Sequence, residues 1–160
     1  RLVVTDPLTG AWNRRHGERI FAADLEEARR YGPALSLLLL DIDPSNEIKD
    51  THGHQVGDAV LLELTRRVTE NLRASDVLVR WGGEEFVILM RHCTLDDARG
   101  LAEKIRALIA DPPFDVAGTV TVSIGAAELG PTDDLSSWLD RADRAMYSAK
   151  AAGRNAVRSA

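Results

Sequence analysis

The spacing of apolar residues along the chain predicts four helices. In four segments, apolar side chains recur every three or four residues and so form one stripe along a helix. Turn-forming or capping residues bound these segments, which we place at 14–31, 58–72, 95–110 and 134–151. The segment 44–57 is polar and irregular, with room for only a short helix.

Runs of apolar and β-branched residues predict strands at 34–42, 77–79, 86–90 and 119–124. We expect Gly125 to mark the end of the fourth strand and residues 155–158 to form a short edge strand. A hairpin must join the second and third strands, which makes them antiparallel, whereas strand–helix–strand crossovers give parallel pairing. The predicted fold is therefore α+β and ferredoxin-like, with a mixed, mostly antiparallel central sheet flanked by helices.

Length and composition fit one ordinary globular domain, which we place at 1–160. The chain has 160 residues, of which 44% are hydrophobic and 28% charged, and it begins at Arg1 rather than at a methionine. We therefore expect one domain of a longer protein. A net charge of −5 argues against DNA or RNA as a partner. The longest apolar run is too short to span a bilayer, and the single cysteine excludes an internal disulfide. We expect a cytoplasmic location without direct membrane contact.

The most informative stretch is Trp81-Gly82-Gly83-Glu84-Glu85-Phe86, between two apolar runs. A Gly-Gly pair between two β-rich runs predicts a hairpin, because glycine accepts the positive φ angles of a tight turn. The tip then carries two adjacent carboxylates, which repel each other unless a cation lies between them. A hard divalent metal is the simplest such cation.

A second acidic pair ends the first predicted strand. Asp41 and Asp43 share one face of that strand because side chains alternate along it. If the hairpin pairs next to this strand, Glu84 and Glu85 come near Asp41, and the cluster suits Mg²⁺ and phosphoryl transfer. Taken separately, each pair is explained as solvated charge at a strand end; taken together, they favour a metal site.

The ordered motifs resemble those of the GGDEF family, the diguanylate cyclases, which condense two GTP into cyclic di-GMP. The hairpin segment matches the signature in its GGEEF form, and the resemblance covers nearly the whole chain. The other matching pieces fall in order: Asp6-Pro7-Leu8-Thr9-Gly10, Asn13-Arg14-Arg15, Asp41-Ile42-Asp43, Gly53-His54, Gly57-Asp58, Arg141-Ala142-Asp143, Ala145-Met146-Tyr147, Ala149-Lys150 and Gly153-Arg154-Asn155. The resemblance implies a nucleotide-cyclase type of the predicted fold and a preceding regulatory region.

The resemblance implies a role for each residue at a matching position. Asp41, Glu84 and the backbone carbonyl of Ile42 would ligate Mg²⁺ or Mn²⁺. Glu84 would also help to deprotonate the ribose 3′-hydroxyl, and Glu85 would support a second metal. The remaining substrate contacts would come from Gly82 and Gly83 beside the phosphates, Lys150 and Arg154 on the terminal phosphates, Asp58 on guanine, and His54 beside the nucleotide.

The resemblance also implies partners beyond GTP. Each domain binds one GTP, so the active form would be a homodimer. Arg73 and Asp76 resemble the family's RxxD site, where the product cyclic di-GMP binds as an inhibitor, and Lys104 would replace an arginine from the next helix. The simpler interpretation of this pair is an arginine that ends a helix and an aspartate in the following loop.

The segment after Asp43 departs from the family pattern. Asn46 stands where a lysine would neutralise phosphate charge, a loss of about 1.5–3 kcal/mol, and Lys49 stands where an asparagine would read guanine. Pro44 stiffens the loop, and Ser45 removes an aromatic residue. We therefore predict retained metal binding and a weakened cyclase. The alternatives are a degenerate domain that acts as a cyclic di-GMP receptor or GTP-binding module, and Mg²⁺-dependent chemistry on another nucleotide.

Overall fold

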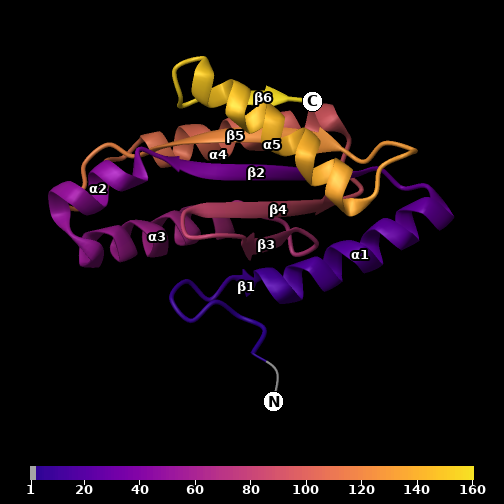
Figure 1. The fold of residues 1–160 in the computed structure, drawn as a ribbon, viewed down its shortest axis with the longest axis horizontal. Helices are drawn as coiled ribbons and strands as arrows, with labels where there is room; N and C mark the ends of the chain where they lie inside the picture. The colour runs from indigo at the N-terminus through magenta and orange to yellow at the C-terminus, as the bar shows by residue number, and fades with distance from the viewer. Residues whose placement is uncertain (1–2) are drawn as a thin grey trace.

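The computed structural model describes residues 3–160, except for the side chain of Ser45, so the expectation attached to that side chain lies outside it. Within residues 3–160 the chain forms six strands and five helices (Figure 1). The strands are β1 (Trp12–Asn13), β2 (Leu35–Asp43), β3 (Val77–Arg80), β4 (Glu85–Arg91), β5 (Thr121–Glu128) and β6 (Val157–Ser159). The helices are α1 (Arg14–Tyr31), α2 (Ser45–His52), α3 (His54–Thr69), α4 (Leu95–Ala110) and α5 (Leu135–Ala151).

The strands form one mixed sheet in the order β1-β3-β4-β2-β5-β6. The central pairs β3–β4, β4–β2 and β2–β5 are antiparallel, and the two edge strands β1 and β6 join their neighbours in parallel. The predicted α+β architecture is therefore confirmed, and the hairpin lies directly beside β2 as the acidic cluster requires.

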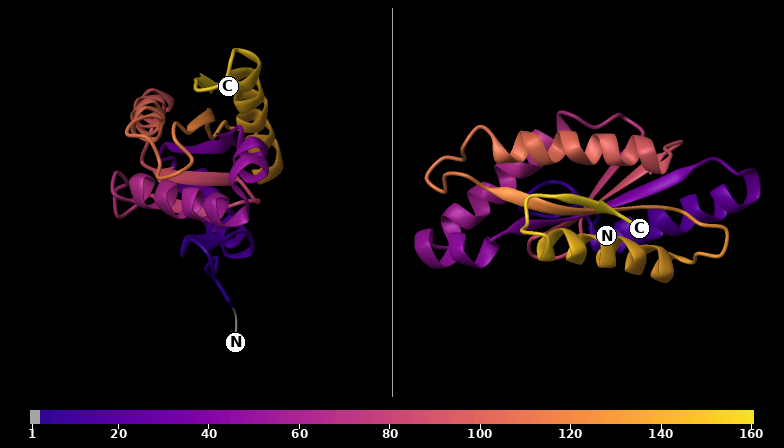
Figure 2. Two further views of the ribbon diagram at one scale, coloured as in Figure 1. Left: turned by 90° about the vertical axis from the view of Figure 1, so that its left-hand side faces the viewer. Right: turned by 90° about the horizontal axis from the view of Figure 1, so that it is seen from above.

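Helices cover both faces of the sheet (Figure 2). Strand alternation divides the core: Leu37 and Leu39 of β2 pack with α1 and α5, whereas Leu38 and Leu40 pack with α3 and α4. Asp41 and Asp43 belong to the α5 face, and Lys150 of α5 and Ser123 of β5 bond them. The predicted placement of these two aspartates on one face is confirmed. None of the helices in residues 3–160 has the length and apolar character needed to cross a membrane.

Several elements differ from the prediction, among them the edge strand β6, which lies at Val157–Ser159 instead of 155–158. The polar segment folds into α2, and Gly53, with φ of 85°, separates it from a helix that begins at His54 rather than near 58 and ends at Thr69. Strand β5 runs through Gly125 to Glu128 instead of ending there. The two-residue strand β1 is too short to leave a periodic pattern and was not predicted.

An arginine clamp joins α3 to the end of α4. The guanidinium of Arg67 is buried and donates to the carbonyls of Leu108, Ile109 and Pro112. It also forms an ion pair with Glu63, one turn earlier in α3. Hydrogen bonds from Arg66 and then Arg67 lower the pKa of Glu63 to about 2. The stability from this group is present above the unfolded-state pKa and is lost as pH falls toward the folded-state pKa.

We expect Glu63→Gln to destabilise the domain at pH 7 by about 1 kcal/mol. The difference from the wild type should shrink as pH falls below about 4.5, the ordinary pKa of a glutamate. Urea unfolding at pH 7, 5 and 4 measures it. Glu70→Gln is the matched control, because Glu70 pairs with Arg66 at an exposed position. A constant difference at all three pH values would contradict the assignment.

Candidate active site

A polar cavity of about 420 Å³ lies where β2 ends and the β3–β4 hairpin turns. The acidic residues Asp41 and Glu84 line it beside two cations, Lys150 and Arg154. The other lining residues come from the end of β2 and the start of α2: Ile42, Asp43, Pro44, Asn46 and Glu47. The structure thus brings together residues from three separate parts of the sequence, 41–47, 84 and 150–154, as the motif order implied.

The hairpin tip is held from both sides. The amides of Trp81 and Gly82 donate to the Glu85 carbonyl at 2.8 and 3.2 Å, and Arg80 donates to the Gly83 carbonyl at 2.8 Å. Neither glycine of the signature has a positive φ, so the positive-φ reason given for the Gly-Gly pair is wrong, although the hairpin itself forms. An added Cβ on Gly83 would meet nothing within 4 Å. The glycines instead leave the rim of the tip bare, where a ligand can come close to the backbone.

Asp41 lies opposite Glu85 in the β2–β4 register, which is the pairing that the acidic cluster needed. Lys150 forms an ion pair with Asp41. Glu85 itself is not among the residues that line the cavity. Burial raises the pKa of Glu85, and the nearby carboxylates of Asp41 and Asp143 raise it further. Glu85 therefore lies in a carboxylate-rich environment next to Asp41.

Asp43 has a structural role that the sequence did not reveal. Its side chain is buried (the residue is 2% exposed) and accepts hydrogen bonds from Ser123, Thr121 and the Asn155 amide. Arg154 and Asn155 follow α5 in a turn with positive φ angles of 65° and 44°. Asp43 thereby fixes the turn that carries Arg154 to the cavity.

Glu84 pairs with a lysine that the cavity does not include. The Lys49 ammonium, from α2, bonds to Glu84 Oε1. Lys49 also lines a small groove of about 10 Å³ between the sheet, α2 and α3. Of the other predicted substrate residues, Asn46 lines the main cavity, whereas His54 and Asp58 are exposed on the first turns of α3 and lie outside both sets of lining residues.

The donor set fits a divalent metal that arrives with phosphates. Within residues 3–160, no three His, Cys, Asp or Glu side chains are grouped so that they could hold a metal by themselves. Asp41 and Glu84 nevertheless face one cavity, with Ile42 beside them. Mg²⁺ commonly takes one or two carboxylates and completes its shell with phosphate oxygens and water. The residues therefore match Mg²⁺ or Mn²⁺ and do not form a closed, all-protein site.

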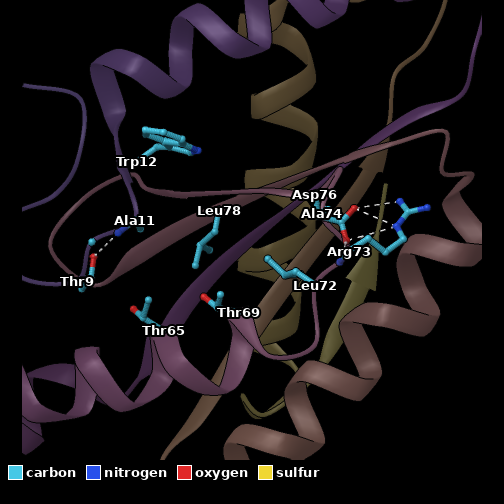
Figure 3. Close-up of a pocket in the computed structure, with 11 residues that line it drawn as sticks. Thr9, Ala11, Trp12, Thr65, Thr69, Leu72, Arg73, Ala74, Asp76 and Leu78 are labelled. Atoms are coloured by element: carbon cyan, nitrogen blue, oxygen red, sulfur yellow. Dashed lines mark hydrogen bonds and ion pairs between the residues drawn. The ribbon is translucent and has the colours of Figure 1, made fainter. Parts of the chain in front are cut away.

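A second cavity, of about 540 Å³, contains the RxxD pair (Figure 3). The Arg73 guanidinium donates to Asp76 at 3.0 and 3.2 Å and to the Arg91 carbonyl at 2.9 Å. The Asp76 side chain is only 1% exposed, whereas that of Arg73 is 53% exposed. The structure thus brings Arg73 and Asp76 together, but Lys104, exposed on α4, does not line this cavity. A different cation, Arg91, bonds to this turn: it donates to the Ser75 carbonyl at 3.4 Å.

Arg80 is a site residue that the sequence reasoning missed. It bonds to the hairpin tip and also to both oxygens of Asp6 at 3.1 Å, so it ties the opening turn of the chain to the signature. Burial acts to raise the pKa of Asp6, but hydrogen bonds from Thr9 and Arg80 outweigh it and lower the pKa. The sequence did contain a signal for this role, because an arginine at the end of a buried strand, two residues before the Gly-Gly pair, needs hydrogen-bond acceptors.

The mixed sheet, with a Gly-Gly-Glu-Glu-Phe hairpin beside an aspartate-ended strand, defines a GGDEF-type domain. The family profile described as diguanylate cyclase, GGDEF domain, matches residues 3–156. The chain belongs to the GGDEF family.

Individual relatives agree with this assignment. The chain is 45% identical over 98% of its length to the response regulator PleD of Caulobacter vibrioides, and 37% identical over 94% to the probable diguanylate cyclase DgcC of Escherichia coli. It spans only 36% and 41% of these two proteins.

Two solved structures have nearly the same fold. The GGDEF domain of DgcB from Caulobacter crescentus, described in complex with c-di-GMP, has a TM-score of 0.96 at 31% identity, with 99% of this chain and 96% of that chain covered. The active GGEEF domain of a diguanylate cyclase from Vibrio cholerae has a TM-score of 0.88 at 34% identity, with 92% of this chain and 96% of that chain covered.

Proposed function

We propose that this domain is a diguanylate cyclase that condenses two GTP into cyclic di-GMP with release of two pyrophosphates. One observation carries the proposal: Asp41, Glu84, Lys150 and Arg154 face a single cavity at the signature hairpin. Paired carboxylates beside paired cations suit a nucleotide triphosphate with its metal. Since GTP is the substrate, we place the reaction in the cytoplasm.

Each residue of the cavity has a distinct task in this reaction. Lys150 and Arg154 bind the terminal phosphates, the lysine as a point charge and the arginine as a planar fork. Asp41 and Glu84, with the Ile42 carbonyl, would hold the Mg²⁺ or Mn²⁺ ion. A bound ion supplies charge neutralisation on the phosphates and lowers the pKa of the attacking hydroxyl. Glu84 accepts the proton of the ribose 3′-hydroxyl.

The bond changes require two copies of the domain. The 3′-oxygen of one GTP attacks the α-phosphorus of the other, and the bond from that phosphorus to the pyrophosphate breaks. Repetition with the roles exchanged closes the ring. Because each domain binds one GTP, the active species is a homodimer whose two cavities face each other.

Product formation tests the proposal directly. We would fuse the chain to a dimerising coiled coil, supply GTP and Mg²⁺, and separate the nucleotides by chromatography. Cyclic di-GMP supports the proposal and shows that Asn46 and Lys49 are compatible with turnover. The fusion supplies the dimer, so absence of product would refute the assignment as a cyclase.

The second candidate is a receptor that binds cyclic di-GMP without making it. Two observations favour it: the departures at Pro44, Asn46 and Lys49 cluster beside the cavity, and the Lys49 ammonium engages Glu84. Arg73 and Asp76 would then be the binding site. The same preparation decides between the two functions, because a receptor binds cyclic di-GMP but yields none from GTP.

We expect Arg73→Ala to weaken cyclic di-GMP binding at this site by about 10- to 100-fold, because it removes a charged, forked donor. In an active cyclase the same change should prolong product formation by relieving inhibition. Calorimetric titration with cyclic di-GMP measures the first effect. Arg99→Ala, an exposed position on α4, is the control. Unchanged binding in Arg73→Ala would assign the Arg73–Asp76 pair to stabilising its own turn.

A further inference from the structure

Lys49 is the residue in which this chain differs most consequentially from its family's pattern. It lies in the last turn of α2, and its ammonium forms an ion pair with Glu84 Oε1 at the hairpin tip. The two side chains are 32% and 25% exposed, so solvent only partly screens the pair. Glu84, one of the two carboxylates that would bind the metal, therefore already has a cation on it.

The stem of the same side chain fills the groove between α2 and α3. A Cβ built on Gly57 would lie 3.2 Å from Lys49 Cγ, so the lysine packs directly on the glycine of α3. The groove that remains has a volume of about 10 Å³, with walls formed by Ile42, Ile48, Val60 and Leu61. That space is about enough for one water molecule and cannot admit a nucleobase.

We propose that Lys49 is a tethered competitor that must leave Glu84, and the groove, before the metal and nucleotide can bind. This inference rests on the proposed metal role of Glu84. An ammonium fixed beside a carboxylate reduces the fraction of domains that are ready to bind, and the apparent dissociation constant rises by the inverse of that fraction. Lys49 thus sets the concentration of divalent metal at which the domain works.

The charge of Lys49 is tested with Mn²⁺ alone as the probe. We expect Lys49→Met, which keeps the stem and removes the charge, to bind Mn²⁺ about tenfold more tightly in an electron paramagnetic resonance titration. Lys49→Arg should bind Mn²⁺ as weakly as the wild type, because it keeps a cation at this position. Arg30→Met removes one positive charge from an exposed position at the far end of α1 and should leave the affinity unchanged.

A double-mutant cycle separates competition at Glu84 from a general change in charge. If Lys49 acts through Glu84, Lys49→Met has no effect on Mn²⁺ affinity in a Glu84→Gln background. An equal gain in both backgrounds overturns the inference, as does an unchanged affinity in Lys49→Met while Glu84→Gln alone weakens binding. The latter result would leave the proposed metal role of Glu84 standing. If Glu84→Gln does not change Mn²⁺ affinity in either Lys49 background, that metal role itself is wrong.

The stem of Lys49 is tested separately, with GTP in the presence of EDTA. Lys49→Ala and Lys49→Met lose the same charge, but only the alanine variant opens the groove. We expect calorimetry to show GTP binding several-fold tighter in Lys49→Ala than in Lys49→Met. Equal affinities would show that the groove takes no part in nucleotide binding and would overturn that half of the inference.

Discussion

Replacement of Glu84 by glutamine is expected to lower cyclic di-GMP formation by at least 100-fold. Glutamine keeps the size of the side chain but cannot accept a proton at pH 7 and is a weaker ligand for a hard cation. Glu84 is the signature carboxylate that lines the cavity, whereas Glu85 is not among the lining residues. Chromatographic assay of the coiled-coil fusion at saturating GTP and Mg²⁺ measures the loss.

Three control measurements show whether this loss of activity comes from the chemical role of Glu84. Cyclic di-GMP binding should be retained in Glu84→Gln, because Arg73 and Asp76 line the other cavity. Thermal unfolding should show that the variant is folded, and Glu103→Gln, on the exposed side of α4, should keep full activity. If Glu84→Gln turned over GTP at the rate of the parent, the catalytic assignment of Glu84 would be wrong.

The features that the sequence predicted well are those determined by short-range periodicity. The apolar stripe and the Gly32 stop define α1 at Arg14–Tyr31, and the observed bounds agree with the predicted ones. Continuous apolar runs identify β2 and β4, since both are buried on two faces. The hairpin between β3 and β4 then brings Glu85 opposite Asp41. The position of the acidic cluster follows from these local patterns together with the pairing of β4 with β2.

The features that it missed depend on contacts between distant segments. Lys49 and Glu84 are 35 residues apart and meet only because α2 folds over the end of β2. The structural role of Asp43 is visible only when its partners on β5 and after α5 are known. The role of Arg80 also depends on a distant contact, because its carboxylate partner Asp6 is 74 residues away. A list of motifs therefore found the residues of the cavity but not the bonds that hold them.

Gly125 shows how a tertiary contact can imitate a local signal. Within a sequence, a glycine after a run of β-branched residues is typical of a strand end. Here it lies within β5, under α5, where an added Cβ would overlap the Ala142 carbonyl oxygen and the Met146 amide nitrogen. The glycine is present because a helix backbone packs directly on the strand.

We therefore expect Gly125→Ala to destabilise the domain by about 3 kcal/mol or more. The obstacle is helix backbone, including Met146 Cα at 3.0 Å, so no side-chain rotation relieves it and α5 must move away from the sheet. For a domain of this size the melting temperature should fall by roughly 6–12 °C, measurable by calorimetry. Gly100→Ala is the matched control: it lies in α4 with open space around it, and alanine there should stabilise the helix by up to about 1 kcal/mol.

The displacement of α5 also gives this variant a functional consequence. Lys150 lies in the last turn of α5 and Arg154 follows that helix, so both of the cations that we propose to bind phosphate should shift with it. Gly125→Ala is then expected to raise the apparent KM for GTP at temperatures where the domain remains folded, whereas Glu84→Gln chiefly lowers kcat. A folded Gly125→Ala variant with normal KM and an unchanged melting temperature would show that the sheet and α5 can separate without cost, contrary to the close packing at this glycine.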